Sequence, residues 1–463
     1  MDGAGGITDD ELAAFDRTVA RLRALPADDP VRLRAERVAE SFARDGRLRR
    51  RKDRHRHRAA VDAAVTAATA TGSATRREDA PLDEPAERRE PGVFARPRRC
   101  YTCKRPYRRA DAFYHLLCPE CAADHSARRR MRTDLTGRRA LLTGGRVKIG
   151  FQLALMMLRD GAELIVTTRF PNDALRRFEA VEGSGEWLDR LTVVGIDLRD
   201  PRQVVGLCER LRADGRPLDI LVNNAAQTVR RPPEAYALLA AGERRAASRG
   251  PRAGVLYAPG YRPMPGASLP RAALAPALPG RHPSAGPDAP PAVDEAGLLP
   301  DTAPRNSWSA RLGELDPAEV LETQLVNALA PALLCDRLLP LLLASPHPRR
   351  YIVNVTAVEG RFAVRNKTAG HPHTNMAKAA LNMLTRTSGP ELAAHGVHMC
   401  AVDTGWITDE NPAPKKARLA ERGFRTPLDV VDGAARVYDP IVRGEAGAPV
   451  SGVFLKDYRE AEW

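Results

Sequence analysis

The sequence predicts an α/β protein built on a doubly wound parallel sheet, preceded by a small cysteine-rich module and a helical or disordered tail. Three observations support this prediction. From Arg138 onward, short β-branched runs alternate with amphipathic runs at helical spacing, which is the pattern of parallel strands joined by crossover helices. A glycine-rich turn separates the first strand from the first helix of this part, and two Cys-x-x-Cys pairs lie upstream of it.

The composition is unusual in its charge and in its content of helix-breaking residues. The chain has 463 residues, of which 38 are proline and 35 glycine, and its formal net charge is +14. This length allows two or three domains, or one domain with tails. Residues 1–134 hold 30 basic and 22 acidic residues, so more than half of the positive excess lies in less than a third of the chain. Such a segment could contact RNA, DNA or another polyanion, or it could be a solvated basic tail.

Residues 1–92 are predicted to form a basic tail that is helical or disordered. Asp9–Leu25 has helical spacing, and Arg47–Arg58 is rich in arginine and histidine. The N-terminus is acidic and lacks the apolar segment of a signal peptide. One of the longest apolar runs, Leu338–Ala344, is interrupted by Pro340 and is far shorter than the roughly 20 residues of a membrane span. We therefore expect a cytoplasmic protein that does not enter a membrane.

Residues 93–134 contain Cys100-x-x-Cys103 and Cys118-x-x-Cys121, separated by 14 residues. This spacing is close to that of zinc ribbons and treble clefs, in which four thiolates bind Zn²⁺ tetrahedrally. We predict a structural zinc at these cysteines, with two disulfides as the alternative. A small apolar core would come from residues between the pairs: Tyr107, Phe113, Tyr114 and Leu117. Basic residues at the edges would suit a nucleic-acid or a protein partner: Arg98, Arg99, Lys104, Arg105, Arg108, Arg109, Arg128, Arg129 and Arg130.

Residues 135–463 are expected to form the sheet and its helices. Near-continuous apolar runs suit parallel strands covered on both faces, and seven are present: Ala140–Thr143, Glu163–Thr168, Leu191–Asp197, Asp219–Asn223, Tyr351–Thr356, His398–Asp403 and Gly452–Lys456. Helical runs lie between them: Ile149–Asp160, Asp173–Val181, Pro201–Ala213, Pro317–Leu343, Thr374–His395 and Pro427–Arg443. An insertion at 229–312, rich in Pro, Ala, Gly and Arg, is expected to be disordered or loosely packed.

The glycine-rich turn between Thr143 and Gly150 is expected to hold the phosphates of a dinucleotide. Gly144 and Gly145 let the backbone approach a pyrophosphate closely, and the N-terminus of the following helix offers free N–H groups. Lys148 stands where a second glycine of such a turn is expected. If the backbone needs a positive φ at this position, we expect a remodelled loop and weak cofactor binding.

Seven short motifs follow one another along this part of the chain: Thr143-Gly144 with Ile149-Gly150, Asp197-Leu198, Asn223-Asn224-Ala225-Ala226, Asn327, Ile352 to Thr356, Lys378, and Asp403-Thr404-Gly405. In this order they resemble the motifs of the short-chain dehydrogenase/reductase family. The resemblance implies a Rossmann-like fold and hydride transfer between NAD(P)(H) and an alcohol or carbonyl. It also implies cofactor-binding residues: Thr143, Gly144, Gly145, Ile149, Gly150, Asp197, Leu198, Asn224, Ala225, Lys378, Thr404 and Gly405. Arg146, Lys148 and Arg169 are added to this set for their positive charge.

The cations near the expected adenosine end of the site favour NADP(H) over NAD(H). Arg169 follows the second strand, where an NAD enzyme usually places an acid for the ribose hydroxyls. Arg146 and Lys148 add positive charge in the phosphate loop. The alternative is that Arg169 leads a surface helix and that Lys148 obstructs the pyrophosphate.

The expected catalytic centre departs from the family pattern. The family's acid is the tyrosine of Tyr-x-x-x-Lys, and this chain has Thr374-Asn-Met-Ala-Lys378. A phenol has a pKa of about 10, and an aliphatic hydroxyl is a much weaker acid. The strand that delivers the family's serine ends in Thr356-Ala357, so Thr356 could replace that serine only if the strand end shifts.

A proton donor other than tyrosine is therefore required. The resemblance implies that Lys378 binds the nicotinamide ribose and that Asn327 helps to hold a relay water. His373 precedes Thr374, and histidine is the commonest general acid. We predict a relay through His373, Lys378 and Asn327, unless His373 only flanks the helix.

We expect an atypical NADP(H)-dependent oxidoreductase with an unknown small-molecule substrate. A catalytically degenerate NADP(H) sensor or scaffold is one alternative, favoured by the missing tyrosine. A nucleic-acid or protein interaction factor that acts through the zinc module is the other. The resemblance also implies a homo-oligomer formed through Pro317–Leu343 and Thr374–His395, unless the insertion blocks it.

Overall fold

The central element is one nine-stranded sheet with β3 (Arg139–Thr143) in its middle. The computed structural model describes residues 6–84, 90–247, 250, 252, 254–264, 293–364 and 367–463. The strand order is β11-β10-β9-β8-β6-β3-β4-β5-β7. The other strands are β4 (Glu163–Thr168), β5 (Leu191–Gly195), β6 (Ile220–Asn223), β7 (Val255–Tyr257), β8 (Arg350–Thr356), β9 (Val397–Asp403), β10 (Phe454–Lys456) and β11 (Arg459–Ala461).

The sheet is doubly wound, as expected. All neighbouring strands are parallel except the β10–β11 pair, which is antiparallel. The chain builds outward from β3 to β5 and then crosses to β6. After β6 it returns to add β7 beside β5, and from β8 onward it builds toward the other edge. The carboxyl ends of β3 and β6 therefore form the switch point at which such sheets bind ligands. The seven expected strands are all present, with ends displaced by at most two residues.

Helices cover both faces of the sheet, which explains why its strands are apolar on both sides. On one face lie α4 (Lys148–Arg159), α5 (Pro171–Glu179) and α12 (Val430–Glu445). On the other lie α6 (Pro201–Asp214), α9 (Ala330–Leu343) and α10 (Pro372–Ala394). Each set closes one apolar core against the sheet.

The expected helix Pro317–Leu343 is not a regular α-helix throughout. It begins as α8 (Pro317–Gln324), passes through a π-helical turn at Leu325–Leu329 and continues as α9. Among the described residues, this run is the one helix long and apolar enough to cross a membrane by length and composition, and its most apolar window is half buried inside the protein. Because a core helix of a soluble protein has the same properties, the run is weak evidence for a membrane span.

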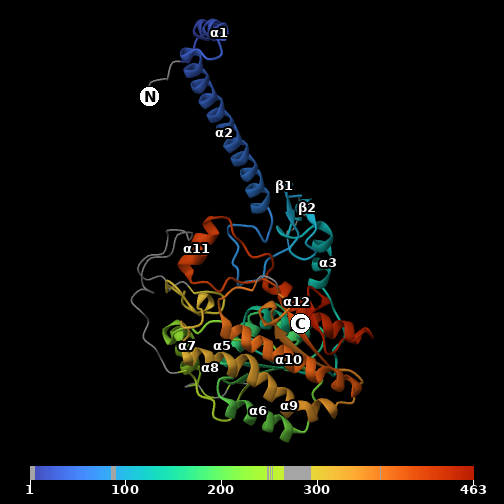
Figure 1. The fold of residues 1–463 in the computed structure, drawn as a ribbon. Coiled ribbons are helices and arrows are strands. Elements are labelled where there is room, and N and C mark those ends of the chain that lie inside the picture. The colour runs from blue at the N-terminus through green and yellow to red at the C-terminus, as the bar shows by residue number, and fades with distance from the viewer. Residues whose placement is uncertain are drawn as a thin grey trace.

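The N-terminal tail is helical in its described part. A capping box between Thr8 and Glu11 starts α1 (Asp9–Arg23), and the side chain of Asp29 caps α2 (Pro30–Ala67). Figure 1 shows α2 projecting from the body of the protein, with α1 at its far end. The helix passes without a break through the arginine-rich run. Residues 1–5 and 85–89 of the predicted tail lie outside the described residues.

The cysteine-rich module consists of β1 (Val93–Arg99), β2 (Pro106–Arg109) and α3 (Pro119–Arg129). It lies between the foot of α2 and α12 (Figure 1). Two helices precede it, so it is not at the N-terminus of the chain. The aromatic core expected for it is confirmed, because Tyr107, Phe113, Tyr114 and Leu117 are all buried. That core is continuous with side chains of the sheet domain, including Ile407 and Leu428, so the module and the domain form one body.

The insertion at 229–312 is more ordered than expected. It contains a 3-10 turn (Pro233–Tyr236), α7 (Ala237–Ala247), β7 and a second 3-10 turn (Ser307–Ser309). The strand β7 pairs with β5 and extends the sheet, and α7 packs against α5. The expectation of a loosely packed insertion was therefore wrong for these parts, because a three-residue edge strand leaves no periodic pattern in the sequence. Residues 265–292 lie outside the described residues.

Candidate cofactor and catalytic site

The glycine-rich turn lies at the switch point and is held there by hydrogen bonds from the neighbouring strand. The Thr143 hydroxyl accepts the backbone N–H groups of Asn224 at 3.0 Å and Ala225 at 2.9 Å. The Asn224 amide donates to the carbonyls of Thr143 at 3.0 Å and Gly144 at 3.2 Å. The pairing of β3 with β6 therefore fixes the entrance that a pyrophosphate would use.

The glycines of the turn are required by close packing. A Cβ at Gly150 would lie 2.1 Å from the Gly144 carbonyl oxygen, and one at Gly145 would lie 2.8 Å from Val166. Gly144 has a φ of +72°, a conformation that favours glycine. The backbone here therefore has the close approach that a dinucleotide site needs, and Ile149 in the first turn of α4 packs against both the sheet core and the core of the cysteine module.

Lys148 adopts the left-handed conformation that a glycine would have, with a φ of +53°. The hydrogen bonds of the turn are nevertheless intact, so the loop is not rebuilt around this residue. Asp294 from the insertion and Glu410 after β9 are its charged neighbours. Burial raises the pKa of Asp294, and the Lys148 ammonium partly opposes this effect. Burial alone would also raise the pKa of Glu410, but the Lys148 and Lys416 ammonium groups help to hold it below its usual value. The charge of Lys148 therefore interacts with both carboxyl groups.

The three cations expected near a 2′-phosphate differ in their surroundings. Arg146 is buried and forms an ion pair with Asp173 at 2.7 Å. Arg169 lies over the ring of Tyr236 at 4.8 Å and donates to its hydroxyl at 3.3 Å. No carboxylate within ion-pair distance of Arg169 occurs in the described part of the chain. Arg146 is therefore paired within the protein, whereas Arg169 has no carboxylate partner at ion-pair distance among the described residues.

An ion pair between two residues of the same loop lies just after β5. The Asp197 carboxylate forms an ion pair with the Arg199 guanidinium at 2.6 Å. The side chain of Leu198 is buried in the apolar core. The hydroxyl of Tyr261 donates to the Arg169 carbonyl at 2.8 Å. Tyr236 and Tyr261 come from the insertion and were not predicted, since nothing in the sequence indicates that the insertion returns to this edge.

The expected nicotinamide side of the site is connected to the cysteine module. Thr404 and Gly405 form a turn after β9, in which Gly405 has a φ of +81° and donates its N–H to Asp403 at 3.2 Å. The next N–H, of Trp406, donates to the hydroxyl oxygen of Tyr101 at 2.9 Å. Burial raises the pKa of Tyr101 to about 12, so this phenol stays protonated. Tyr101 lies between two of the cysteines and was not predicted as a site residue.

Lys378 lies at the carboxyl end of β8, two strands away from the glycine turn. Its ammonium is buried and donates to the Val355 carbonyl at 2.9 Å. Burial lowers the pKa of Lys378 to about 8, and the carboxylate of Glu359 partly opposes this effect. The Thr356 hydroxyl donates to the Lys378 carbonyl at 3.4 Å, so it is held by α10.

The structure does not join the predicted relay residues by hydrogen bonds. Asn327 lies in the π-helical turn, where its side chain accepts the Gln227 N–H at 2.7 Å and donates to the Gln227 carbonyl at 2.8 Å. His373 is fully buried, and burial lowers its pKa, so it is neutral at pH 7. Lys378 donates to Val355 rather than to either residue. The three side chains are therefore not directly hydrogen-bonded to one another, and the relay stays a prediction.

Several buried polar atoms near the start of α10 have no hydrogen-bond partner among the described residues. They are the Thr374 hydroxyl, both ring nitrogens of His373 and the Asn375 side-chain oxygen. Buried polar atoms are nearly always paired in folded proteins. These atoms are therefore exceptions to that rule among the described residues.

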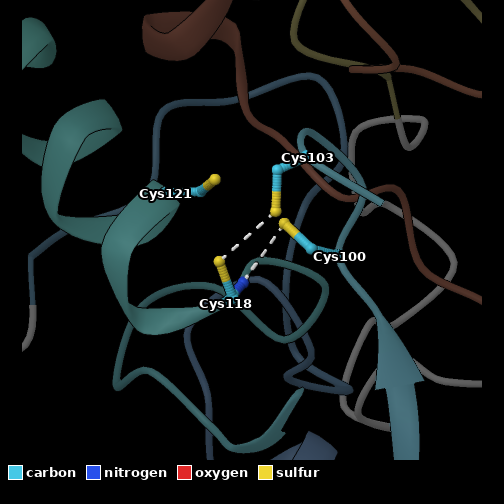
Figure 2. A group of neighbouring side chains, drawn as sticks. All are labelled: Cys100, Cys103, Cys118 and Cys121. Carbon is cyan, nitrogen blue, oxygen red and sulfur yellow. Dashed lines mark hydrogen bonds between the residues drawn. The ribbon is translucent and has the colours of Figure 1, made fainter. Parts of the chain in front are cut away.

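The four cysteines come together as expected. Their sulfur atoms all lie within 4.8 Å of one another, and Cys103 Sγ is 3.7 Å from Cys118 Sγ. Figure 2 shows Cys100 and Cys103 on the turn after β1, and Cys118 and Cys121 at the start of α3, with their sulfurs around one centre. A tetrahedral zinc with Zn–S bonds near 2.3 Å needs sulfurs roughly 3.8 Å apart, so the group fits this metal. No disulfide joins these cysteines.

Many of the basic residues at the module's edge are engaged within the protein. Arg128 pairs with Asp439, and Arg129 with Asp429 and Asp432, all on or beside α12. Others pair locally: Arg105 with Glu120, Arg109 with Glu90 and Arg130 with Glu84. The α3 part of this edge therefore attaches the module to the sheet domain, a use that the sequence did not reveal.

Comparison with known proteins agrees with this architecture. Residues 138–239 match the family described as short chain dehydrogenase, and residues 293–426 match the one described as enoyl-(acyl carrier protein) reductase. The uncharacterized protein R665 of Acanthamoeba polyphaga mimivirus is 30% identical over 357 residues, which are 74% of this chain and 71% of that protein.

Two further proteins are similar to parts of this chain. The short chain dehydrogenase/reductase dpmpG of Macrophomina phaseolina is 35% identical over 94 residues, so the match spans 20% of this chain and about half, 53%, of that protein. A short chain dehydrogenase from Burkholderia cenocepacia J2315, solved in complex with NADP, has a TM-score of 0.44 at 22% identity, covering 70% of this chain and 97% of that one. By its matched segments and its relatives, this chain belongs to the short-chain dehydrogenase/reductase family.

Proposed function

We propose that the protein is an NADP(H)-dependent oxidoreductase that interconverts a carbonyl and an alcohol with a proton donor other than tyrosine. The proposal rests mainly on the position and the burial of Lys378. This residue keeps the family's spacing from position 374, is buried, and holds its ammonium at the end of β8. The glycine turn at the end of β3 supplies the matching cradle for the pyrophosphate.

When bound, NADPH supplies the hydride, and the side chains of this protein must orient it and provide a proton. At pH 7 a lysine with a pKa of about 8 is mainly protonated, so Lys378 can both hold a ribose hydroxyl and act as an acid. Thr374 is a far weaker acid, and His373 is neutral. Lys378 is therefore the proposed source of the proton, directly or through a water near the unpaired Thr374 hydroxyl.

The preference for NADP(H) rests on Arg169, which has no carboxylate within ion-pair distance among the described residues, although its charge lowers the pKa of the Asp197 carboxyl. We expect Arg169→Ala to weaken NADPH binding by about tenfold or more, the effect of losing one charge-assisted contact, with little change in NADH binding. Fluorescence titration of both cofactors measures this difference. Arg176→Ala is the matched control, because Arg176 is an exposed arginine on the same edge that pairs with Asp173. Equal losses for NADPH and NADH in Arg169→Ala would contradict the assignment.

A cofactor-binding sensor or scaffold is the second candidate function. Two observations favour it: Thr374 stands in the position of the catalytic tyrosine, and the charge of Lys148 interacts with the carboxyl groups of Asp294 and Glu410. Tight NADPH binding without turnover across a panel of ketones and aldehydes would favour the sensor. Turnover that Lys378→Met abolishes would favour the enzyme.

The cysteine group is proposed to hold one structural Zn²⁺. Elemental analysis of the purified protein should find one zinc per chain, and Cys121→Ser should lose it while Cys208→Ala, a buried cysteine in α6, keeps it. Because Tyr101 connects the module to the turn at Gly405, zinc removal should also weaken NADPH binding. A metal-free wild-type protein with unchanged thermal unfolding would refute the proposal.

A further inference from the structure

The helix α2 carries a dense band of positive charge that the oxidoreductase chemistry does not use. The twelve residues from Arg47 to Arg58, here called the cationic band, contain seven arginines, one lysine and a single acid, Asp53. Every one of them is exposed. Within the described parts of the chain, the ion pair recorded for the band is that of Arg56 with Asp53, at 3.9 Å. The band is thus an unneutralised surface.

Seven of the eight cations of the band lie on two opposite faces of the helix, and Arg50 lies to one side of the first face. With 3.6 residues per turn, spacings of four, three and four residues keep side chains on one face, and four arginines follow that spacing: Arg47, Arg51, Arg54 and Arg58. Three further cations fall on the opposite face: Arg49, Lys52 and Arg56. At 1.5 Å per residue, the first row is about 16 Å long.

The protein presents this band away from its body. Of the 38 residues of α2, the buried one is Val65, close to its foot. There, Asp62 accepts the N–H of Ala95 at 2.6 Å and anchors the helix to β1. Figure 1 shows the rest of the helix standing clear of the sheet domain. Arg96 and Arg99 on β1 are exposed and continue the positive surface at the foot of the helix.

The positions of the charged and apolar side chains in the band favour one class of partner over others. A membrane-surface helix needs an apolar face, and Leu48 is the one large apolar side chain in the band. Duplex DNA carries one negative charge per roughly 1.7 Å of its axis. Its major groove, about 12 Å wide, accepts an α-helix between two phosphate walls. Cations on opposite faces of one helix suit those two walls, whereas the deep, narrow major groove of duplex RNA excludes side chains.

We propose that the cationic band of α2 binds duplex DNA through its phosphates, in the major groove and without reading the base sequence. Arginine suits this role because its planar guanidinium can form two hydrogen bonds to one phosphate. The proposal does not depend on the cofactor site, which lies in the sheet domain.

Fluorescence anisotropy of the full-length protein with a labelled 20-base-pair DNA duplex tests the proposal. We expect binding at micromolar or lower concentrations in about 50 mM salt, with an affinity that falls steeply as salt rises. Arg51→Gln/Arg54→Gln/Arg58→Gln should make the slope of log K against log salt shallower by about 2.7, since each lost phosphate contact contributes about 0.9. Circular dichroism checks that the helix persists in the variant.

The matched control removes three arginines from the same helix outside the band: Arg34→Gln/Arg37→Gln/Arg44→Gln. It should change the slope by less than one unit, and Lys378→Met should leave DNA binding unchanged. Equal effects of the two triple variants would overturn the assignment to the band. Absence of salt-dependent binding, or tighter binding to duplex RNA or to an acidic peptide than to DNA, would overturn the proposed partner.

Discussion

At the scale of single residues, burial changes the pKa of Lys378, and this change affects both the stability of the protein and the proposed reaction. Free lysine has a pKa near 10.4, whereas burial lowers the pKa of Lys378 to about 8. Between these two values the unfolded chain binds more protons than the folded protein. The contribution of Lys378 to the free energy of unfolding therefore rises with pH across that window. Below pH 8 both states are protonated, and the cost of burying the charge is present in full.

The same pKa predicts how the reaction depends on pH. If Lys378 supplies the proton, kcat/KM for carbonyl reduction by NADPH should fall as the pH rises through about 8, because the ammonium is lost. Steady-state rates between pH 6 and 10 in wild type and Lys378→Arg measure this. The arginine keeps its charge throughout this range, so its residual activity should lack the fall near pH 8. If kcat/KM fell at the same pH in both proteins, the titrating group would be a residue other than Lys378.

Residue spacing predicted the site positions better than it predicted their contacts. Thr143, Gly150 and Lys378 were located because their spacing within a strand or helix fixes where they stand in the fold. The spacing could not reveal Tyr101, which reaches the turn at Trp406 across 305 residues of sequence. It also placed His373 at the site but could not show that its ring is buried without a partner.

At the scale of elements, the contact between α3 and α12 attaches the cysteine module to the sheet domain. Arg129 and Asp429 are almost completely buried, and Asp432 also contacts the guanidinium at 3.3 Å. The Tyr114 hydroxyl donates to Asp432 at 2.6 Å. Burial, then repulsion by Asp432, raises the pKa of Asp429, and the Arg129 charge opposes both effects. The positive charge of Arg129 therefore stabilises the negative charge of both buried carboxylates.

Arg129→Ala should lower the free energy of unfolding by about 3–5 kcal/mol, because it leaves buried carboxylates without a counter-charge. Arg130→Ala is the control, since Arg130 pairs with Glu84 on the surface and such pairs contribute about 0–1 kcal/mol. Urea unfolding of both variants at pH 7 measures the difference. If the two variants lost similar amounts, α3 would not be anchored through this contact.

The insertion shows where sequence patterns stop being informative. Its composition predicted a loose segment, but β7 lengthens the sheet by one strand. Glu243 on α7 accepts the backbone N–H groups of Asn172 at 3.2 Å and Asp173 at 2.9 Å. These interactions cap the start of α5 through residues about 70 positions away. A local pattern cannot show a cap supplied from such a distance.

At the scale of the whole molecule, segments that the sequence presents as separate parts pack on one another. The linker before the module meets the insertion where Glu295 donates its N–H to Asp79 at 2.7 Å. The insertion in turn meets the start of α10, where the rings of Trp308 and His371 stack at 4.0 Å. The described residues of the insertion thus contact α10 at its first turn and leave its later turns open.

Those later turns and the neighbouring helices expose large apolar side chains. Met376 and Met383 on α10 are 58% and 53% exposed, and Leu321 on α8 and Leu329 in the π-helical turn are 65% and 51% exposed. The two elements pack side by side. Large apolar side chains exposed on neighbouring elements are typical of an interaction site, and a two-fold symmetric pair of chains would cover them with the same residues from each copy.

We therefore expect the protein to be a dimer in solution, with twice the mass of the 50.5 kDa chain by light scattering after gel filtration. Leu329→Glu/Met383→Glu should give the mass of one chain, because two buried charges on each copy would face an apolar surface. Leu48→Glu is the control, since Leu48 is similarly exposed, at 48%, but lies on α2. If it also dissociated the dimer, the effect would not be specific to α8 and α10, and the assignment of the interface to these helices would fail. A wild-type protein that is monomeric at micromolar concentration would contradict the prediction, and it would leave this apolar face for a different protein.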